Sequence, residues 1–321
     1  MAKEPIKKLA VEHILVTPDQ AGRRIDNFLT GYLKDIPKTR IYKMLRKGEV
    51  RVNGSRVKPD YRLTDQDSVR VPPVYRNHMG AKQQKPPPVL LGIINDRIIY
   101  EDDYILAVDK PAGLAVHAGS GEQFGLIELL RNLRADQPFM ELVHRLDKPT
   151  SGCLLLAKDH RTLRNLHAML QENRVKKSYL ALLKGQLTGD TEVILPLRKN
   201  ELLSGERMVQ VHSDGKVAKS SFHPEQEFQT ACLARISITT GRTHQIRVHA
   251  ASIGHPVIGD DKYGDRHFNR LMKKTGLKRM FLHAESLVLK LPYSGVVKTI
   301  STPLPDDLLS FLSRLREHIH A

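Results

Sequence analysis

Cysteine is scarce in this sequence: of its 321 residues, only Cys153 and Cys232 are cysteines. The two do not form a paired spacing, so neither a zinc-binding motif nor a disulfide framework is indicated. The sequence also lacks any run of 18 apolar residues, and its N-terminus lacks a long apolar segment. We therefore expect neither a membrane span nor a signal peptide, and a reducing, cytoplasmic location is the default expectation.

Acidic residues are few relative to basic ones. The chain holds 35 Asp and Glu against 51 Lys and Arg, which gives a formal net charge of +16. The imbalance is strongest in residues 1–89, where 19 basic residues face 9 acidic ones. A basic surface attracts phosphates, so this distribution favours a nucleic acid as partner and a separate nucleic-acid-binding module near the N-terminus.

Residues 21–75 show two short helical patterns followed by strand-like alternation. The first helical pattern starts after Gly22 and stops at Pro37, and Gly48 is placed to end the second. Asn53-Gly54 then predicts a tight hairpin turn between two short strands. The pattern is typical of a small, compact domain.

Basic side chains are concentrated on the second helix of this segment and beside the hairpin. They outnumber the acidic residues nearby, so salt bridges one helical turn apart cannot account for them, although a solvated helix face is the alternative interpretation. The candidate RNA-binding residues here are Lys38, Arg40, Lys43, Arg46, Lys47 and Arg51. The stretches RRIDNFL, IYKMLRKGEVRVNG and DSVRV resemble the small RNA-binding domain named after ribosomal protein S4, which implies that this module binds RNA.

The rest of the chain predicts one large domain. We expect a polar leader at 1–20, the small domain at 21–75, an extended polyproline linker at 76–92 and the large domain at 93–321. Apolar runs predict strands at 105–108, 154–157, 179–183 and 233–238, and periodicity predicts helices at 125–134, 160–172, 244–253 and 305–317. Because strands and helices do not alternate regularly, the expected fold class is α+β, with a large, mainly antiparallel sheet and a small N-terminal α/β RNA-binding domain.

The nonapeptide HRLDKPTSG, residues 144–152, concentrates polar residues around a proline. Pro149 disfavours a helix, so Asp147 is expected in a loop that leads into a buried strand. Thr150 and Ser151 are expected to cap the local backbone through their hydroxyls. A lone aspartate beside an arginine suggests a nucleophile or a base rather than a metal ligand, whereas a surface turn cap is the commoner role of such a residue.

The segment GRTHQIRVH, residues 241–249, predicts the start of a short helix with Thr243 as its N-cap. His244 and Arg247 are three residues apart and share a helix face, whereas His249 lies too far around the axis to chelate a metal together with His244. Arg247 on this face can pair with a carboxylate or bind a phosphate, or it can simply be exposed.

Two further segments offer candidate side chains. Tyr179 begins an apolar strand, where it can be a core residue or can stack on a nucleobase. Lys110 and Pro111 lie in a sharp turn and can shape the floor of a site.

These segments, in this order, resemble the HRLD-motif pseudouridine synthases over nearly all of residues 98–300. The resemblance implies that Asp147 is the essential aspartate, that Arg145 helps to expel the target uridine from the RNA helix, that Tyr179 lies beside the base and that Arg247 forms a salt bridge with the aspartate. With the small domain, the stretch 117–133 resembles the subgroup that acts on large-subunit ribosomal RNA.

The expected function is therefore isomerisation of uridine to pseudouridine in large-subunit ribosomal RNA. Such a reaction requires no redox step, so no cofactor and no metal are expected, and no dinucleotide-binding motif is present. The partner is ribosomal RNA, with no membrane, and the chain is expected to be a monomer. The alternatives are a non-catalytic ribosome-assembly or RNA-binding factor and the same chemistry on another RNA such as tRNA. A metal-dependent nuclease is disfavoured because the site has no clustered carboxylates.

Overall fold

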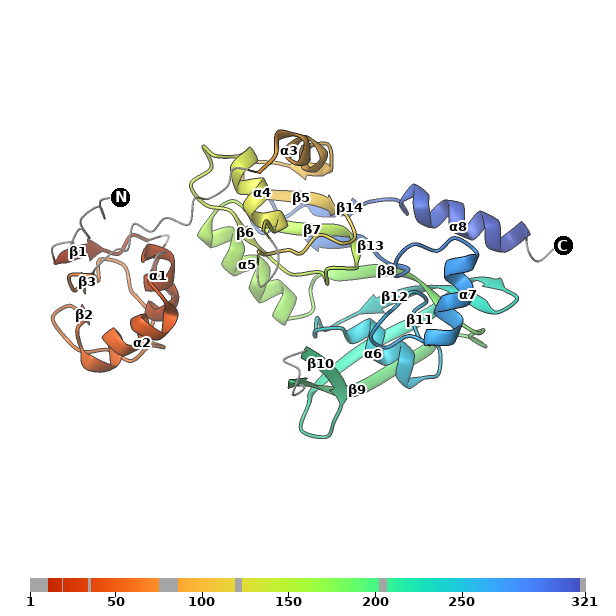
Figure 1. Ribbon diagram of the computed structural model, residues 1–321. Coiled ribbons are helices and arrows are strands. Elements are labelled where there is room, and N and C mark those ends of the chain that lie inside the picture. Colours follow the sequence, from red (N-terminus) through yellow and green to blue (C-terminus); the bar gives the residue numbers. More distant parts are fainter. Residues whose placement is uncertain are drawn as a thin grey trace, which may run out of the picture. The chain divides into compact units, whose positions relative to one another are not determined.

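The computed structural model describes residues 11–18, 20–33, 36–74, 86–118, 123–201 and 207–317 (Figure 1). The chain divides into two compact units, Met1–Lys85 and Pro86–Ala321, each of which is described by itself. Among the residues so described, none of the helices has the length and apolar character needed to span a membrane.

The small unit is a three-stranded antiparallel sheet with two helices. Its elements are β1 (Glu12–Leu15), α1 (Ile25–Tyr32), α2 (Lys38–Lys47), β2 (Arg51–Val52) and β3 (Ser68–Val71), and the strand order is β1-β3-β2. Within the leader expected at 1–20, residues 12–15 form β1, which pairs with β3 along its whole length, and Ile14 packs on the core of this unit. Residues 1–10 lie outside the described part of the chain.

Two glycines shape this unit as the sequence indicates. Gly48 adopts a left-handed conformation, with φ of 68°, and ends α2. Asn53 and Gly54 both have positive φ, 50° and 78°, and the backbone groups of Val52 and Ser55 exchange hydrogen bonds around them. This is the hairpin turn that favours glycine and asparagine, so the predicted turn is confirmed.

The polyproline linker expected at 76–92 was wrong from Pro88 onward. Pro88 is the first residue of α3 (Pro88–Asn95), where the missing N–H costs nothing because the first helical N–H groups have no intrahelical acceptor. Ile94 of this helix is fully buried in the main core of the large unit. Residues 75–85 are outside the described part of the chain.

The large unit is built on an 11-stranded sheet of order β10-β9-β11-β12-β8-β13-β7-β5-β4, with β14 beside β13 and β6 beside β7. All of its pairs are antiparallel except β13 with β7, so the predicted α+β class with a mainly antiparallel sheet is confirmed. Its strands are β4 (Ile98–Glu101), β5 (Ile105–Lys110), β6 (Glu141–Leu142), β7 (Ser151–Ala157), β8 (Lys176–Lys184), β9 (Thr191–Glu201), β10 (Arg207–Val211), β11 (Lys216–Phe228), β12 (Ala231–Ile238), β13 (Leu282–Lys290) and β14 (Val297–Ser301).

Four helices of the large unit lie close to their predicted positions. They are α4 (Leu126–Leu133), α5 (His160–Gln171), α6 (Gln245–Ser252) and α8 (Asp306–Glu317). A further helix, α7 (Arg266–Lys274), was not predicted.

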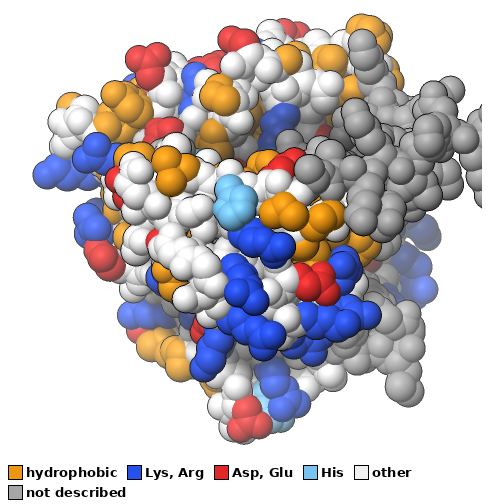
Figure 2. All heavy atoms as spheres, turned by 90° about the vertical axis from the view of Figure 1, so that its left-hand side faces the viewer, with side chains coloured by type: hydrophobic (Ala, Val, Ile, Leu, Met, Phe, Trp, Pro, Cys, Tyr) orange, Lys and Arg blue, Asp and Glu red, His pale blue; other side chains and the backbone are white. Residues whose placement is uncertain are grey.

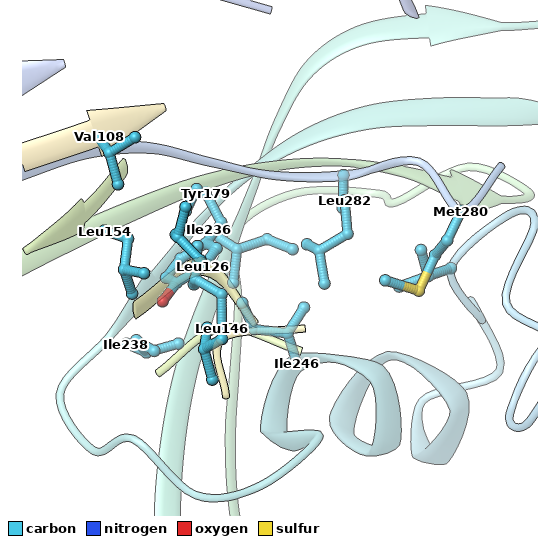
Figure 3. Packing of buried hydrophobic residues seen from close by; sticks show 14 of the residues in the cluster. Val108, Leu126, Leu146, Leu154, Tyr179, Ile236, Ile238, Ile246, Met280 and Leu282 are labelled. Carbon is cyan, nitrogen blue, oxygen red and sulfur yellow. The ribbon is translucent and has the colours of Figure 1, made fainter. Parts of the chain in front are cut away.

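The central strands β5 and β7 are buried on both faces, as their apolar sequences indicate. Leu106 and Val108 of β5 pack with residues of α3, α4 and α6, whereas Ile105 and Ala107 pack on the other face with residues of α5. Figure 3 shows the first of these clusters, in which Tyr179 of β8 lies close to Leu126 and Ile236. This cluster also contains Leu146, so the core directly supports the HRLD segment.

Candidate active site

Asp147 lies in the loop that joins β6 to β7. Its backbone carbonyl accepts a hydrogen bond from Thr150 N at 3.0 Å, which closes a turn around Pro149. The Asp147 side chain is 16 % exposed, so its carboxylate is shielded from bulk water yet open to a small cavity of about 70 Å³. The predicted loop is therefore present, and it presents one carboxylate to a cavity.

Lys110 fixes the base of this loop. The side chain is fully buried, and Nζ donates hydrogen bonds to the carbonyls of Pro111, Leu114 and Lys148 at 2.9, 2.9 and 3.2 Å. Burial lowers the pKa of Lys110 to about 7, while the negative charge of Asp147 acts in the opposite direction. Lys110 thus ties three backbone carbonyls together beside Asp147.

The end of the loop requires glycine. Gly152 has φ of 115°, and a Cβ at this position would lie 2.2 Å from the carbonyl oxygen of Ala284 on β13. The side chain of Ser151 does not cap the local backbone as expected. Its Oγ lies 3.0 Å from His283 Nδ1 and accepts from Arg279 Nη1 at 3.1 Å, because the side chain points toward the neighbouring strand.

Arg247 of α6 contacts Asp147, as the resemblance to the HRLD-motif synthases implies. Nη1 donates to Oδ2 of Asp147 at 3.1 Å, and the side chain of Arg247 is 4 % exposed. The same guanidinium makes two parallel hydrogen bonds to Asp260, from Nε at 2.7 Å and from Nη2 at 2.8 Å. Arg247 therefore lies between two carboxylates, and bidentate contact with Asp260 orients the edge that faces Asp147.

Asp260 is the buried counter-ion of Arg247. Burial alone would raise the pKa of Asp260, but the hydrogen bonds and charge of Arg247 outweigh it, so the pKa is lowered. Burial likewise acts to lower the pKa of Arg247, whereas Asp260 and then Asp147 raise it above its ordinary value. Both groups are therefore charged at neutral pH.

His244 also faces Asp147, with Nε2 at 3.8 Å from Oδ2. The expected N-cap, Thr243, was wrong: His244 itself precedes the first helical residue and has φ of 55°. Its Nδ1 lies 2.8 Å from the hydroxyl of Tyr263, which already accepts from Val209 N at 2.8 Å. The tyrosine proton is thus available to Nδ1, and we assign the imidazole proton to Nε2, on the side of Asp147. Burial lowers the pKa of His244, although Asp147 opposes this effect, and the ring is neutral at pH 7.

Tyr179 and Arg145 complete the cavity around Asp147. Tyr179 is 7 % exposed and forms part of the wall, and Arg145 is exposed and lies at its edge. Burial, and then the charge of Asp147, raises the pKa of Tyr179, so its hydroxyl stays protonated. The structure therefore brings Asp147, Tyr179, Arg247 and Arg145 to one cavity, while their catalytic and RNA-binding roles stay predictions.

The candidate RNA-binding residues of the small unit belong to a different unit from the one that contains this cavity. Five of the six are exposed, and Arg40 alone is partly buried, with an ion pair to Glu49 at 2.8 Å. Arg51 donates to the carbonyls of Gly48 and Gly54 at 3.4 and 3.3 Å. In Figure 2, Lys and Arg side chains gather on the face turned toward the viewer, with few acidic side chains between them.

Sequence reasoning missed Asp260 and Tyr263. Both lie in the segment GDDKYGD, residues 259–265, whose composition indicates only a turn. His244 was noted for its helix face, but its contact with Tyr263 had no signal in the sequence. Within the described ranges, no group of three or more His, Cys, Asp or Glu side chains is arranged to hold a metal ion.

Comparison with known proteins agrees with this geometry. The sequence model described as RNA pseudouridylate synthase matches residues 104–252, and the S4 domain model matches residues 23–69. The chain is 48 % identical to ribosomal large subunit pseudouridine synthase C of Pasteurella multocida (strain Pm70), over 98 % of this chain and 97 % of that protein. It is also 48 % identical to the protein of the same name from Escherichia coli (strain K12), over 96 % of this chain and 97 % of that protein.

Solved structures agree on the fold. The human RNA pseudouridylate synthase domain containing 4 superposes with a TM-score of 0.59 at 24 % identity, over 71 % of this chain and 96 % of that chain. The human RNA pseudouridylate synthase domain containing 1 gives a TM-score of 0.54 over 68 % of this chain and 94 % of that chain, also at 24 % identity. With an S4 domain, an HRLD loop and near-full-length relatives of one kind, the chain belongs to the RNA pseudouridylate synthase family of enzymes.

Proposed function

We propose that this enzyme isomerises specific uridines to pseudouridine in large-subunit ribosomal RNA. The observation that carries the proposal is the carboxylate of Asp147, held by Arg247 in a cavity walled by Tyr179. The names of the relatives, which match this chain over nearly its full length, support large-subunit ribosomal RNA as the substrate.

The chemistry suits a site built from side chains alone. The reaction breaks the C–N bond between ribose and uracil and forms a C–C bond at the same ribose carbon, so no atom is gained or lost. Asp147 acts directly on the target nucleotide, as a nucleophile or as a base. Arg247 keeps its charge beside Asp147 throughout, because Asp260 compensates it from the other side. No cofactor and no metal are proposed.

The target base is stacked in structured RNA and must leave the helix to reach Asp147, which costs a few kcal/mol. Arg145 is exposed at the edge of the cavity, where it can occupy the place that the base vacates. Tyr179 then supplies an aromatic wall for the detached uracil, and the basic residues of the S4 domain bind backbone phosphates.

Replacement of Asp147 tests the proposal. Asp147→Asn keeps the size of the side chain but removes its charge, so we expect RNA binding close to that of the unsubstituted enzyme and no pseudouridine. Asp103→Asn, at an exposed carboxylate in the turn between β4 and β5, is the control and should retain full activity. Pseudouridine formed by the Asp147→Asn enzyme would refute the role of this residue.

Mapping pseudouridines in cells that lack this protein tests the substrate. We expect specific sites in large-subunit ribosomal RNA to lose the modification, and tRNA to keep its own. Loss in tRNA alone would assign the same chemistry to tRNA, and no loss at all would favour a non-catalytic assembly factor. We further propose that the enzyme acts in the cytoplasm as a monomer, which its mass in solution and its cellular location test.

A further inference from the structure

A second, larger cavity adjoins the one that contains Asp147. Its volume is about 500 Å³, and its wall is formed by the segment before Asp147, the end of α5, the start of β8 and the loop after β12. The two cavities share Arg145, Tyr179 and Arg242. A strand of RNA that brings its target base against Tyr179 therefore passes the second cavity as well.

Lys177 is the buried cation of this second cavity. Its side chain lines the cavity, although the residue is only 7 % exposed. Nζ lies beside Gly241, 3.8 Å from the position that a Cβ would take there. Across the described ranges we find neither a hydrogen bond nor an ion pair to this ammonium group, and burial lowers the pKa of Lys177 with no carboxylate to oppose it. Lys177 is thus largely desolvated yet lines the cavity, so a negative charge that a ligand places there would stabilise the ammonium form.

The rest of the wall is also suited to an anion. Arg145 and Arg242 expose their side chains at the cavity, and none of the residues that line it is acidic. The loop that carries Arg242 is held in place by Gln245, whose Oε1 accepts from Thr240 Oγ1 at 2.7 Å and from Arg242 N at 3.0 Å. The amide of Gln245 in turn donates to Lys219 O at 2.8 Å, so this wall is fixed before any ligand binds.

We propose that the second cavity binds a backbone phosphate of the substrate RNA next to the target uridine, with Lys177 as its buried cation and Arg242 at its mouth. This inference rests on the proposed function, because it takes RNA as the ligand. The phosphate neutralises Lys177 and anchors the strand at a fixed distance from Tyr179. The anchor positions the target nucleotide over Asp147 and takes no part in the chemistry.

The test compares two adjacent lysines of β8 in the full-length chain. Lys177→Gln should weaken binding of a substrate RNA about tenfold, which is the usual size of one charge-assisted contact. It should also reduce the magnitude of the slope of log K against log salt by about 0.7 to 0.9. Lys176→Gln is the matched control, because Lys176 is exposed and neighbouring residues of a strand point to opposite faces; it should change neither quantity. Lys177→Arg keeps the charge and should keep the slope.

A neutral phosphate in the RNA identifies the contact. A methylphosphonate placed at each phosphate around the target uridine should weaken binding by the enzyme at one position, and the Lys177→Gln enzyme should be insensitive to that same position. All of these binding measurements use the Asp147→Asn background, which does not turn over, so they are independent of whether pseudouridine is formed. Equal sensitivity of both enzymes at every position, or an unchanged salt slope in Lys177→Gln, would overturn the proposal.

Discussion

The arrangement of the site depends on the guanidinium group of Arg247. It makes three hydrogen bonds to carboxylates, of which two go to Asp260 and only one goes to Asp147. The bidentate pair determines the plane of the guanidinium, so Nη1 points toward Asp147 with or without substrate. Asp260 is therefore expected to act through Arg247, as a positioning residue.

Asp260→Asn tests this dependence. The substitution leaves a buried arginine short of one charge partner, so we expect the free energy of unfolding to fall by about 3 kcal/mol. We also expect the rate of pseudouridine formation at saturating RNA to fall by about 10²-fold, because a misplaced group costs about this much. Asp261→Asn is the control, since the neighbouring side chain is 85 % exposed and should change neither value. An unchanged rate in Asp260→Asn would show that Asp147 does not depend on this orientation.

His144 of the HRLD motif makes a contact typical of a structural residue. Leu155 N donates to His144 Nε2 at 3.2 Å, which requires a neutral ring. Burial lowers the pKa of His144 to about 4, so between pH 6.5 and about 4 the unfolded chain takes up a proton that the folded chain does not. Stability should therefore fall as the pH decreases through this window, by at most about 3 kcal/mol from this residue, and be unaffected by it above pH 6.5.

His144→Gln isolates this contribution, because the glutamine carbonyl can still accept from Leu155 N but does not titrate. We expect urea unfolding at pH 7 and pH 4.5 to show a smaller loss of stability in the variant than in the unsubstituted protein. The buried histidines His249 and His283 are present in both proteins, so their contributions to the pH dependence of stability cancel in the comparison. Identical pH dependence in the two proteins would mean that His144 does not resist protonation.

Whether a single site residue can be predicted from the sequence depends on the motif that surrounds it. Asp147 and Arg247 lie in motifs long enough to identify, and the three-residue spacing places His244 on the same side as Arg247. Asp260 has no such signal, because it lies in a turn 13 residues after Arg247 and only the fold brings the two together. Nothing in the sequence distinguishes Lys177 from Lys176; only the fold shows that Lys177 is buried and Lys176 exposed.

At the scale of elements, the predictions succeeded where apolar periodicity was strong and bounded by caps or breakers. Helix α5 is such a case, with Asp159 accepting from Thr162 N at its start. Helix α7 was missed although Phe268, Leu271 and Met272 recur at helical spacing, because three apolar residues among nine form a pattern too short to stand out from the turn before it. Helix α3 was missed because a run of prolines suggested an extended segment, whereas a proline is equally suited to the first position of a helix.

The close approach of β7 to β13 is an element-scale feature that a single methyl group can test. In Gly152→Ala the new Cβ would meet the carbonyl oxygen of Ala284 at 2.2 Å, and the backbone has positive φ. Gly113→Ala is the matched control, since Gly113 also has positive φ, 86°, but no atom lies within 4 Å of its Cβ position. We expect about 1 kcal/mol of destabilisation in the control and a further 1–3 kcal/mol in Gly152→Ala.

Thermal or urea unfolding of the two variants provides the measurement. The HRLD loop leads directly into β7, the strand that the new methyl group would displace. Gly152→Ala should therefore also reduce the rate of pseudouridine formation, and Gly113→Ala should reduce it less. Equal stability of the two variants would show that β7 and β13 can separate without cost.

At the scale of the whole molecule, we expect the two units to carry separate tasks. Among the residues that the structure describes, the buried apolar cluster of the small unit contains none from the large unit, and the clusters of the large unit contain none from the small one. Each unit therefore has its own core, and removal of residues 1–85 should leave Pro86–Ala321 folded. The residues around Asp147 all lie in the large unit.

Deletion of residues 1–85 tests whether the small unit contributes to RNA binding while the large unit carries out the reaction. The deletion removes the exposed cations Lys38, Lys43, Arg46, Lys47 and Arg51. Each phosphate contact contributes about 0.7 to 0.9 to the magnitude of the slope of log K against log salt, so the loss of five contacts should reduce that magnitude by about 4 and weaken RNA binding. At saturating RNA, the truncated enzyme should still form pseudouridine, because Asp147, Tyr179 and Arg247 remain.

The full-length triple variant Lys43→Gln, Arg46→Gln, Lys47→Gln separates charge from the mere presence of the small unit. It keeps the core of that unit, because all three side chains are exposed, and should lose most of the affinity that the deletion loses. If the triple variant binds like the unsubstituted enzyme while the deletion binds weakly, the small unit contacts RNA through other residues. Equal affinity and equal salt slope in the deletion itself would show that the large unit alone holds the RNA, with Lys177 and its neighbours as its main phosphate contacts.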